Sequence, residues 1–283
     1  MKDYFCGWYF KCQSDSETLA LIPSFHKTKN GKFSSVQLIT ESEAFAFTFP
    51  YESFKKDKNI FLINIGKSSF GASGVNIYLH NPDVSVVGAV EFKNLSPIKY
   101  DIMGPFKYVP FMECRHSVYS MMHRVSGDIY INGRRYKFKD DFGYIEGDRG
   151  HSFPEEYLWT QTAFEGGSLM LSVAKIPVGV FNFTGIIGIV QLNGKEYRIA
   201  TYLGARIEKL GGGEAIIRQG SIKLSAKLIK KHAHPLLAPN MGIMERTIHE
   251  SAACRASYRF EIGGDTLLSF ETRFASFEYE YKR

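Results

Sequence analysis

Three Asn-Gly dipeptides constrain the fold of this 283-residue chain more than any other feature of its sequence. They stand at 30–31, 132–133 and 193–194, between runs in which apolar and polar residues alternate. A two-residue type I′ turn needs positive φ at both central residues, which Asn and Gly tolerate best. Each dipeptide therefore predicts a β-hairpin, as in "DIYINGRRYKF" (128–138).

Strand-length runs separated by turn signals continue almost to the end of the chain, and no apolar period of 3.6 residues is sustained. The glycine run 211–213 lacks the spacing and the Lys-Ser/Thr of a phosphate-binding loop, so it predicts another hairpin turn. Phe, Tyr and Trp make up 14% of the residues, which suits pleated sheets and apolar pockets. We predict an all-β fold of antiparallel barrels or sandwiches.

The length of the chain allows one large β domain or two smaller ones. A Pro-x-Gly break in "AKIPVGVF" (174–181) follows a long strand-like run, and further such runs come after it. We place a boundary there, which gives an N-terminal β domain at 1–175 and a C-terminal β domain at 176–283.

Composition argues against several classes of partner. The net charge of +6 comes from scattered basic residues without interleaved aromatics, so we expect no nucleic-acid partner. The longest apolar run, 178–190, is too short and too interrupted for stable membrane insertion, although transient membrane contact stays open. The opening residues lack the apolar run of a secretory signal, and the four cysteines form no CxxC pair. Free thiols in a reducing cytoplasm are the simplest account.

The segment "GYIEGDRGHSFPEEYLWTQ" (143–161) combines acids with aromatics. If the chain is extended there, period-two alternation places Tyr144, Glu146 and Asp148 on one face. In the strand that follows, it likewise groups Tyr157, Trp159 and Gln161. A carboxyl group on an aromatic wall is desolvated, so it can stay protonated near neutral pH. Such an acid can protonate an otherwise inert group, and the π faces can stabilise the resulting cation.

A structural interpretation of the same segment stays open. Arg149 follows Asp148 directly, and an ion pair that pins a loop would have the same sequence. If the Arg149 guanidinium binds Glu146, that carboxylate is held ionised and is lost as an acid catalyst. The position of Arg149 therefore distinguishes an enzyme from a carrier.

Histidines offer two further candidate sites. In "MECRHSVYSMMHRV" (112–125) the more apolar face carries His116, which we expect to point inward beside adaptable Met and Cys side chains. His232 and His234 form an H-x-H pair, but no third metal ligand is identifiable. We predict no metal site and no cofactor.

The sequence resembles the tocopherol cyclase family in its bacterial branch. "GWYFKC" (7–12) is similar to the family's N-terminal strand, and "HPLLAPN" (234–240) with "ACR" (253–255) is similar to its C-terminal motifs. The central segment resembles the family signature at the following positions: Tyr144, Glu146, Gly150, Phe153, Pro154, Trp159 and Gln161. The resemblance implies two lipocalin-like β domains that hold an oily substrate in a barrel or between them.

The resemblance also implies the reaction, in which a hydroquinone oxygen adds across the nearest double bond of its prenyl tail. It makes Glu146 the candidate proton donor, with Tyr144 and Trp159 as walls for the cation and Gln161 as a partner for a phenol oxygen. Asp148 stands where plant members carry a neutral polar residue, which makes it a second candidate acid.

Arg149 stands where plant members carry an aromatic, so the substrate is left open. Two hypotheses follow for the whole chain. It is a cofactor-independent cyclase or hydratase of a prenylated aromatic or isoprenoid, or it is a lipocalin-like carrier or sensor of a hydrophobic molecule.

Overall fold

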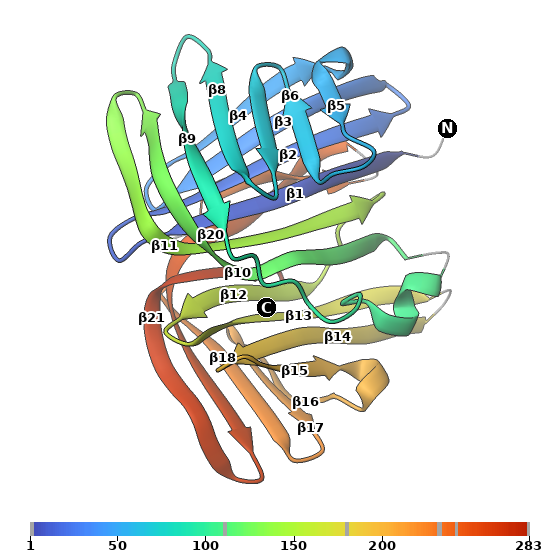
Figure 1. The fold of residues 1–283 in the computed structure, drawn as a ribbon. Helices are drawn as coiled ribbons and strands as arrows, with labels where there is room; N and C mark the ends of the chain where they lie inside the picture. Colours follow the sequence, from blue (N-terminus) through green and yellow to red (C-terminus); the bar gives the residue numbers. More distant parts are fainter. Residues whose placement is uncertain (1–2, 110–111, 179–180, 231–233, 241–242, 282–283) are drawn as a thin grey trace.

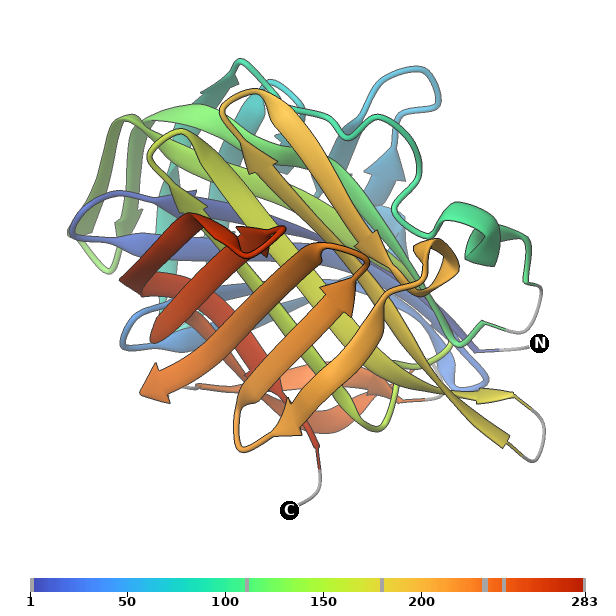
Figure 2. The ribbon, with the colours of Figure 1, turned by 90° about the horizontal axis from the view of Figure 1, so that it is seen from below.

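The computed structural model describes residues 3–109, 112–178, 181–230, 234–240 and 243–281. In this part of the chain antiparallel strands form two sheets, one from the first half of the sequence and one from the second (Figure 1). Seen from below, the second sheet lies in front of the first (Figure 2). The prediction of an all-β chain is confirmed, and the curled sheets are those of lipocalin-like β domains.

Sheet 1 has 11 strands among the described residues, in the order β4-β3-β2-β1-β11-β10-β9-β8-β7-β6-β5. Short 3₁₀ turns at Tyr51–Ser53 and Gly104–Tyr108 interrupt its connections. The strands are β1 (Tyr4–Gln13), β2 (Thr18–Thr28), β3 (Gly31–Thr40), β4 (Ala44–Pro50), β5 (Phe54–Lys56), β6 (Leu62–Ile65), β7 (Ser68–Gly71), β8 (Gly74–His80), β9 (Ser85–Lys93), β10 (Cys114–Ile131) and β11 (Arg134–Gly150).

Sheet 2 follows the order β15-β14-β13-β12-β21-β20-β18-β17-β16, and β19 pairs with β20 beside this path. A 3₁₀ turn at Thr201–Leu203 follows β15. Its strands are β12 (Tyr157–Phe164), β13 (Gly167–Val178), β14 (Phe181–Leu192), β15 (Lys195–Ala200), β16 (Arg206–Gly211), β17 (Glu214–Gln219), β18 (Ile222–Lys230), β19 (His234–Asn240), β20 (Ile243–Ile262) and β21 (Asp265–Tyr279).

All three Asn-Gly dipeptides lie at hairpins, but they do not all play the same part. Asn132 and Asn193 have φ of 49° and 50°, and the following glycines also have positive φ, as the type I′ turn requires. At the first dipeptide Gly31 pairs with Thr28, so the two turn residues are 29 and 30 instead. The glycine run 211–213 lies at the hairpin between β16 and β17, as predicted, with residues 212 and 213 as the turn and Gly211 paired with Glu214.

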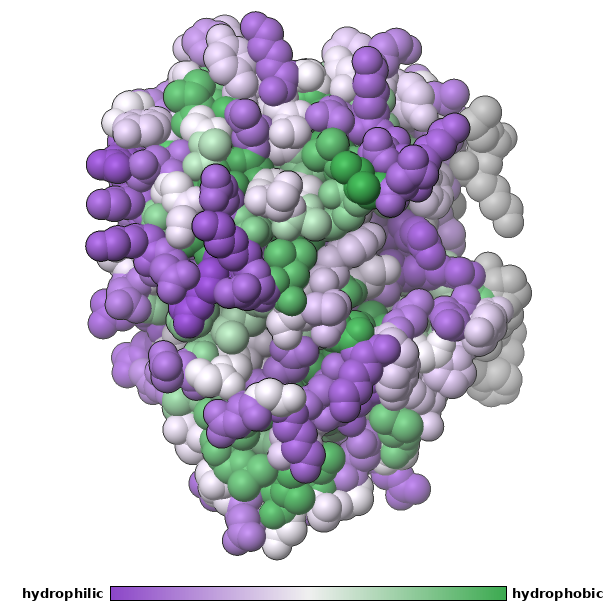
Figure 3. All heavy atoms as spheres, viewed as in Figure 1, coloured by the Kyte–Doolittle hydropathy of each residue, from purple (hydrophilic) through white to green (hydrophobic). Residues whose placement is uncertain are grey.

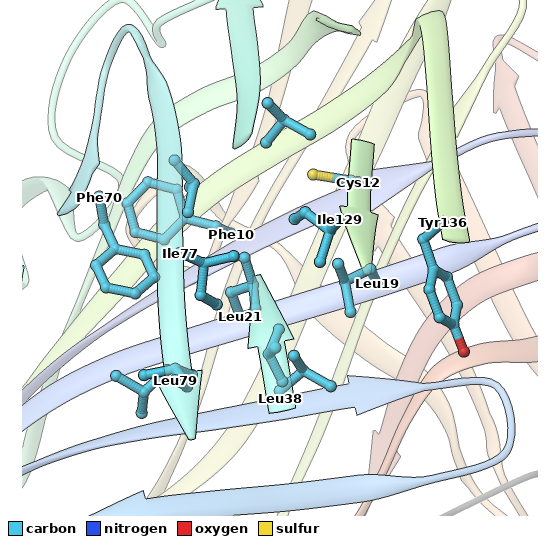
Figure 4. Close-up of a cluster of buried hydrophobic side chains, with 14 of the residues drawn as sticks. Phe10, Cys12, Leu19, Leu21, Leu38, Phe70, Ile77, Leu79, Ile129 and Tyr136 are labelled. Atoms are coloured by element: carbon cyan, nitrogen blue, oxygen red, sulfur yellow. The ribbon is translucent and has the colours of Figure 1, made fainter. Parts of the chain in front are cut away.

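Three clusters of buried side chains hold the fold together. One fills sheet 1, and its tightly packed members include Phe10, Leu21 and Ile77 (Figure 4). A second fills sheet 2. The third contains Tyr9 and Tyr144 from sheet 1 with Trp159 from sheet 2, so it joins the two sheets. Burying one such large side chain stabilises a fold by about 1.5–3 kcal/mol, so the third cluster favours a fixed arrangement of the sheets.

The chain passes from one sheet to the other between Gly150 at the end of β11 and Tyr157 at the start of β12. The boundary suggested by the sequence, between 175 and 176, instead falls inside β13. Pro177, which begins the Pro-x-Gly break that suggested it, still lies within that strand and pairs with Asn182 of β14. The change of sheet occurs at "HSFPEE" (151–156), within the charged segment.

Other expectations from composition can be compared with the structure. The four cysteines form no disulfide. Among the described residues, no helix has the length and apolar character needed to cross a membrane. Hydrophilic residues cover much of the face seen in Figure 3, with smaller hydrophobic areas between them. The side chains of the H-x-H pair at 232 and 234 lie outside the described residues.

Candidate active site between the two sheets

A pocket lies between the two sheets, and both contribute to its walls. Its volume is about 170 Å³, counted as space open to the centres of water molecules. A single water needs roughly 10–15 Å³ on this measure, so the pocket has room for an organic ligand. The walls are mainly apolar, with aromatic residues from β1, β12, the β9–β10 connection and the β11–β12 connection; these are Phe5, Trp8, Tyr9, Phe106, Phe153, Tyr157 and Trp159.

Three ionisable side chains from neighbouring strands meet on the sheet 1 wall. His116 on β10 lies opposite Asp148 on β11 in the strand register, and Glu146 comes two residues before Asp148 on the same face. The Nδ1 atom of His116 lies 3.0 Å from Oδ1 of Asp148, and its Nε2 atom lies 3.2 Å from Oε2 of Glu146. The imidazole therefore stands between two carboxyl groups.

The contact with Glu146 differs from the contact with Asp148. The Nε2 atom of His116 is buried and lacks a well-aligned hydrogen bond. At 3.2 Å from Glu146 it makes mainly an ion-pair contact, because its angle departs from that of an ordinary hydrogen bond. At Nδ1, by contrast, the ring is hydrogen-bonded to Asp148, which also accepts a hydrogen bond from Cys114.

The Glu146 carboxyl group is buried and held by several neighbours. Its Oε2 atom accepts hydrogen bonds from the Tyr144 hydroxyl at 2.5 Å and from the Trp159 indole at 3.2 Å. Both bonds and the His116 contact fall on this one oxygen, so Oε1 has no hydrogen-bond partner among the described residues. Glu146 also lines the pocket, and Oε1 is the oxygen that a ligand can meet.

Burial raises the pKa of Glu146, and the charge of Asp148 adds to this rise. The imidazolium of His116 and the hydrogen bond from Tyr144 oppose it, but the net direction is upward. Burial lowers the pKa of His116, yet the charges of Glu146 and Asp148 more than offset this and raise it well above its ordinary value. Burial and mutual charge therefore favour the protonated forms of Glu146 and His116 inside an apolar pocket.

A second carboxyl group faces the pocket from sheet 2. Glu278 on β21 lies opposite Trp159 on β12 in the strand register and is 8% exposed. The Tyr157 hydroxyl donates a hydrogen bond to its Oε2 atom. Burial raises the pKa of Glu278 to about 8, with the charges of Glu146 and Asp148 adding to the rise and the Tyr157 bond opposing it.

The ligand atoms of His116, Glu146 and Asp148 lie within 4.8 Å of one another, close enough to be considered for a metal ion. A metal needs an imidazole nitrogen with a free lone pair, and its ligands must point at one centre. Here the two ring nitrogens face different carboxyl groups, and the raised pKa of His116 favours the form in which both are protonated. The geometry suits a shared proton better than a divalent cation.

Some of the predicted site residues line the pocket and others do not. Glu146, Asp148, His116 and Trp159 all line the pocket. Tyr144 is buried and does not line the pocket itself. Its hydroxyl donates a hydrogen bond to Glu146, which does.

Gln161 does not line the pocket. Its Oε1 atom accepts a hydrogen bond from the buried ammonium group of Lys11 at 3.3 Å. Lys11 also donates to the Phe274 carbonyl oxygen, so Gln161 belongs to a polar link between the sheets. Its proposed contact with a phenol oxygen has no support in this arrangement.

Arg149 is exposed and lies on the opposite face of β11 from Glu146 and Asp148. Within the described part of the chain it forms no ion pair with either carboxylate. His116 instead occupies the position between the acids. The feature that would have favoured the carrier hypothesis, a guanidinium bound to Glu146, is therefore not found.

Sequence reasoning missed Glu278 and Tyr9 as pocket residues, although alternation placed Tyr157 on the same face as Trp159. Glu278 alternates with aromatics in "FEYEYKR" (277–283), which reads as an acid on the solvent face of a terminal strand. Its partner Tyr157 is 121 positions away, so no local pattern connects the two. The only local signal is the alternation of acids with aromatics, the pattern that also marks the Glu146 segment.

Solved structures of very different sequence share this fold. The crystal structure of CghA with Sch210972 matches with a TM-score of 0.64 at 10% identity, covering 99% of this chain and 88% of that chain. A putative AttH from Nitrosomonas europaea gives 0.56 at 9% identity, covering 100% and 94%. Kievitone hydratase from Nectria haematococca gives 0.54 at 6% identity, covering 98% and 89%.

At such identities the likeness establishes the fold alone. No protein-family model matches the chain, and no curated protein matches it in sequence. The resemblance to tocopherol cyclases therefore rests on the motifs described above.

Proposed function

We propose that the protein is a cofactor-independent enzyme that adds an oxygen nucleophile across an alkene in its inter-sheet pocket, with Glu146 as the proton donor. One observation carries this proposal. A buried carboxyl group whose pKa is raised presents an unpartnered oxygen to an apolar, aromatic-lined pocket. A carboxylic acid in such a site can protonate a carbon–carbon double bond, which a solvated carboxylate cannot do.

The reaction proceeds in two balanced steps. The Glu146 proton passes to one alkene carbon as the π electrons form the new C–H bond, which leaves a carbocation at the other carbon. The rings of Trp159 and Tyr9, 5.5 Å apart and edge to face, border the pocket and can stabilise this cation. An oxygen lone pair then bonds to the cationic carbon, and the proton lost from that oxygen returns to Glu146.

His116 and Asp148 have a supporting part in this scheme. When Glu146 gives up its proton, the resulting carboxylate lies 3.2 Å from the His116 imidazolium. The cation stabilises the ionised acid, and Asp148 fixes the ring through Nδ1. The cluster therefore lowers the cost of separating charge in a site with few water molecules.

The nucleophile distinguishes two forms of the reaction. A hydroxyl group of the substrate itself gives ring closure, which is the reaction that the tocopherol cyclase resemblance implies. Water gives hydration, and one protein of this fold carries the name kievitone hydratase. We propose cyclisation of a prenylated aromatic or other isoprenoid in the cytoplasm, because the walls are apolar and the cysteines are free thiols.

A non-catalytic carrier of a hydrophobic molecule is the second candidate. The observation that favours it is that His116 pairs with both acids, an arrangement that a purely structural cluster shares. Under this hypothesis Glu146 has no proton to transfer, and its replacement by an uncharged amide changes binding little.

Turnover of a defined probe decides between the two candidates. Geranylhydroquinone is incubated with the wild-type protein, and the ring-closed product is measured by mass spectrometry. Glu146→Gln removes the acid proton and keeps the shape, so turnover should fall by about 10²–10⁴-fold while the melting temperature stays nearly unchanged. The matched control is Glu155→Gln, which should retain full turnover. Glu155 is exposed and lies on the connection that joins the two sheets.

An organic extract of the natively purified protein extends the test to unknown substrates. An isoprenoid recovered at near-stoichiometric level supplies the compound on which Glu146→Gln is then assayed. Equal turnover by Glu146→Gln and the wild type would contradict the proposed role of Glu146.

A further inference from the structure

Glu278 is a buried ionisable group in the pocket that the mechanism leaves unused. Its carboxyl group comes from β21 of sheet 2, whereas Glu146 comes from β11 of sheet 1. Only Oε2 of Glu278 is engaged, by the Tyr157 hydroxyl. Among the described residues Oε1 has no hydrogen-bond partner, and Glu278 lines the pocket.

We infer that Glu278 is a second substrate-binding group, which donates a hydrogen bond to an acceptor oxygen of the ligand while Glu146 faces its alkene. The inference rests on the proposed function for the identity of the pocket as a substrate site. It adds the class of substrate, a hydrocarbon chain that carries a carbonyl or ether-type oxygen within reach of the opposite sheet.

The charges around Glu278 determine which form it takes. Glu146 and Asp148 face it from β11, Tyr157 binds it from β12, and Glu280 follows it beyond the end of β21. No described Lys, Arg or His forms an ion pair with it. With burial, these acidic neighbours raise the pKa of Glu278 to about 8, so the carboxyl group is neutral at pH 7 and can donate a hydrogen bond.

The hydrogen bond from Tyr157 fixes the direction of that donation. Because Oε2 accepts from the tyrosine, the proton resides on the other oxygen, Oε1, which has no partner within the described residues. A ligand that can only donate finds no acceptor of comparable strength there. A ligand oxygen with lone pairs completes the arrangement, since a buried donor without a partner is costly.

Two probes that differ in one oxygen test the inference. Geranylacetone carries a ketone, which can only accept hydrogen bonds, and its control is the hydrocarbon in which CH₂ replaces the carbonyl group. Dissociation constants are measured at pH 6 and pH 9.5 for the wild type, Glu278→Gln and Glu278→Met. The Gln side chain keeps a neutral donor at every pH, and the Met side chain keeps volume without a donor.

At pH 6 the wild type should bind the ketone about five- to tenfold more tightly than the hydrocarbon, which is the effect of one hydrogen bond. At pH 9.5 Glu278 is ionised and this preference should disappear. Glu278→Gln should keep the preference at both pH values, and Glu278→Met should lack it at both. Binding of the hydrocarbon by Glu278→Met shows that this variant has folded.

Equal binding of ketone and hydrocarbon by the wild type at pH 6 would overturn the inference. A preference that Glu278→Met retains would also overturn it, since the donor would then be another group. Neither outcome affects the proposed function, which depends on turnover by Glu146. Failure of the wild type to bind either probe, together with no turnover of geranylhydroquinone, would contradict both.

Discussion

Glu146 and Glu278 are two carboxyl groups with similar surroundings and different electrostatics. Each is buried, each accepts a hydrogen bond from a tyrosine, and each faces the same pocket from its own sheet. Glu146 has a histidine 3.2 Å away, whereas no described Lys, Arg or His forms an ion pair with Glu278. Burial therefore raises both pKa values, but only that of Glu146 is lowered in part by a neighbouring cation.

The difference shows how one pocket can hold two acids with separate tasks. An acid that must release its proton needs a nearby positive charge to stabilise the resulting carboxylate. An acid that only donates a hydrogen bond works best when ionisation is strongly disfavoured. Environments that separate the pKa values of two titratable groups commonly mark such a division of roles.

The largest effect should come from removing the cation that distinguishes the two acids. His116→Ala leaves Glu146 and Asp148 without it, so the free energy of unfolding should fall by about 3 kcal/mol at pH 5. The loss should be smaller at pH 8, because the raised pKa of His116 gives stability that is complete below the unfolded value of 6.5 and declines as pH rises above it. Urea denaturation at the two pH values measures both losses.

His123→Ala is the matched control for that comparison. His123 is also buried on β10, but burial lowers its pKa to about 3, so it is uncharged between pH 5 and pH 8. Its folded pKa lies below the unfolded value of 6.5, so the wild type loses stability from this group as pH falls, and the loss caused by His123→Ala should be smaller at pH 5 than at pH 8. If the loss caused by His116→Ala is likewise smaller at pH 5, the ion-pair account of the cluster is wrong.

A second effect should follow from the pKa of Glu278. Its folded pKa of about 8 lies above the ordinary value of 4.5, so the folded state holds a proton that the unfolded chain releases between these limits. Stability from this group is fully present below pH 4.5 and is lost as pH rises to about 8, at about 1 kcal/mol per pH unit. Glu278→Gln should remove that decline.

Melting curves from pH 5 to pH 8 measure the effect. The wild type and Glu278→Gln should converge at low pH, and the variant should be the more stable at pH 8. Parallel curves would mean that Glu278 ionises normally, and the distinction between the two acids would then fail.

The comparison also explains how much of the site could be predicted from sequence. The Asn-Gly and Gly-Gly turns identified the hairpins because turn chemistry is local. The grouping of Glu146 with Asp148 was predicted because β11 is regular at that point, so alternation places both on one face. The partner of Glu146 was not predictable, since the choice between Arg149 and His116 depends on which strand pairs with β11.

Long-range and irregular features account for what the sequence did not reveal. Alternation correctly predicted that His116 points inward. However, β10 shifts register after Val118 and again after Ser120, and beyond these shifts Met121 and His123 are the buried residues. Glu278 was missed because β21 is buried on both faces near its end, where one sheet covers the other. In the sequence, a buried acid on such a strand has the same neighbouring residues as a solvent-exposed acid.

The smallest effect should come from Arg149, the residue on which the sequence-based choice between enzyme and carrier depended. Its side chain is exposed on the face of β11 away from both acids, so Arg149→Ala should change the free energy of unfolding by less than about 0.5 kcal/mol. The pH dependence of turnover should also stay the same, because the cation beside Glu146 is His116. Turnover of geranylhydroquinone from pH 5 to pH 9 checks this. A shift of the profile in Arg149→Ala would mean that the guanidinium acts on Glu146 after all, and Glu146 would then lose the property that separates it from a structural ion pair.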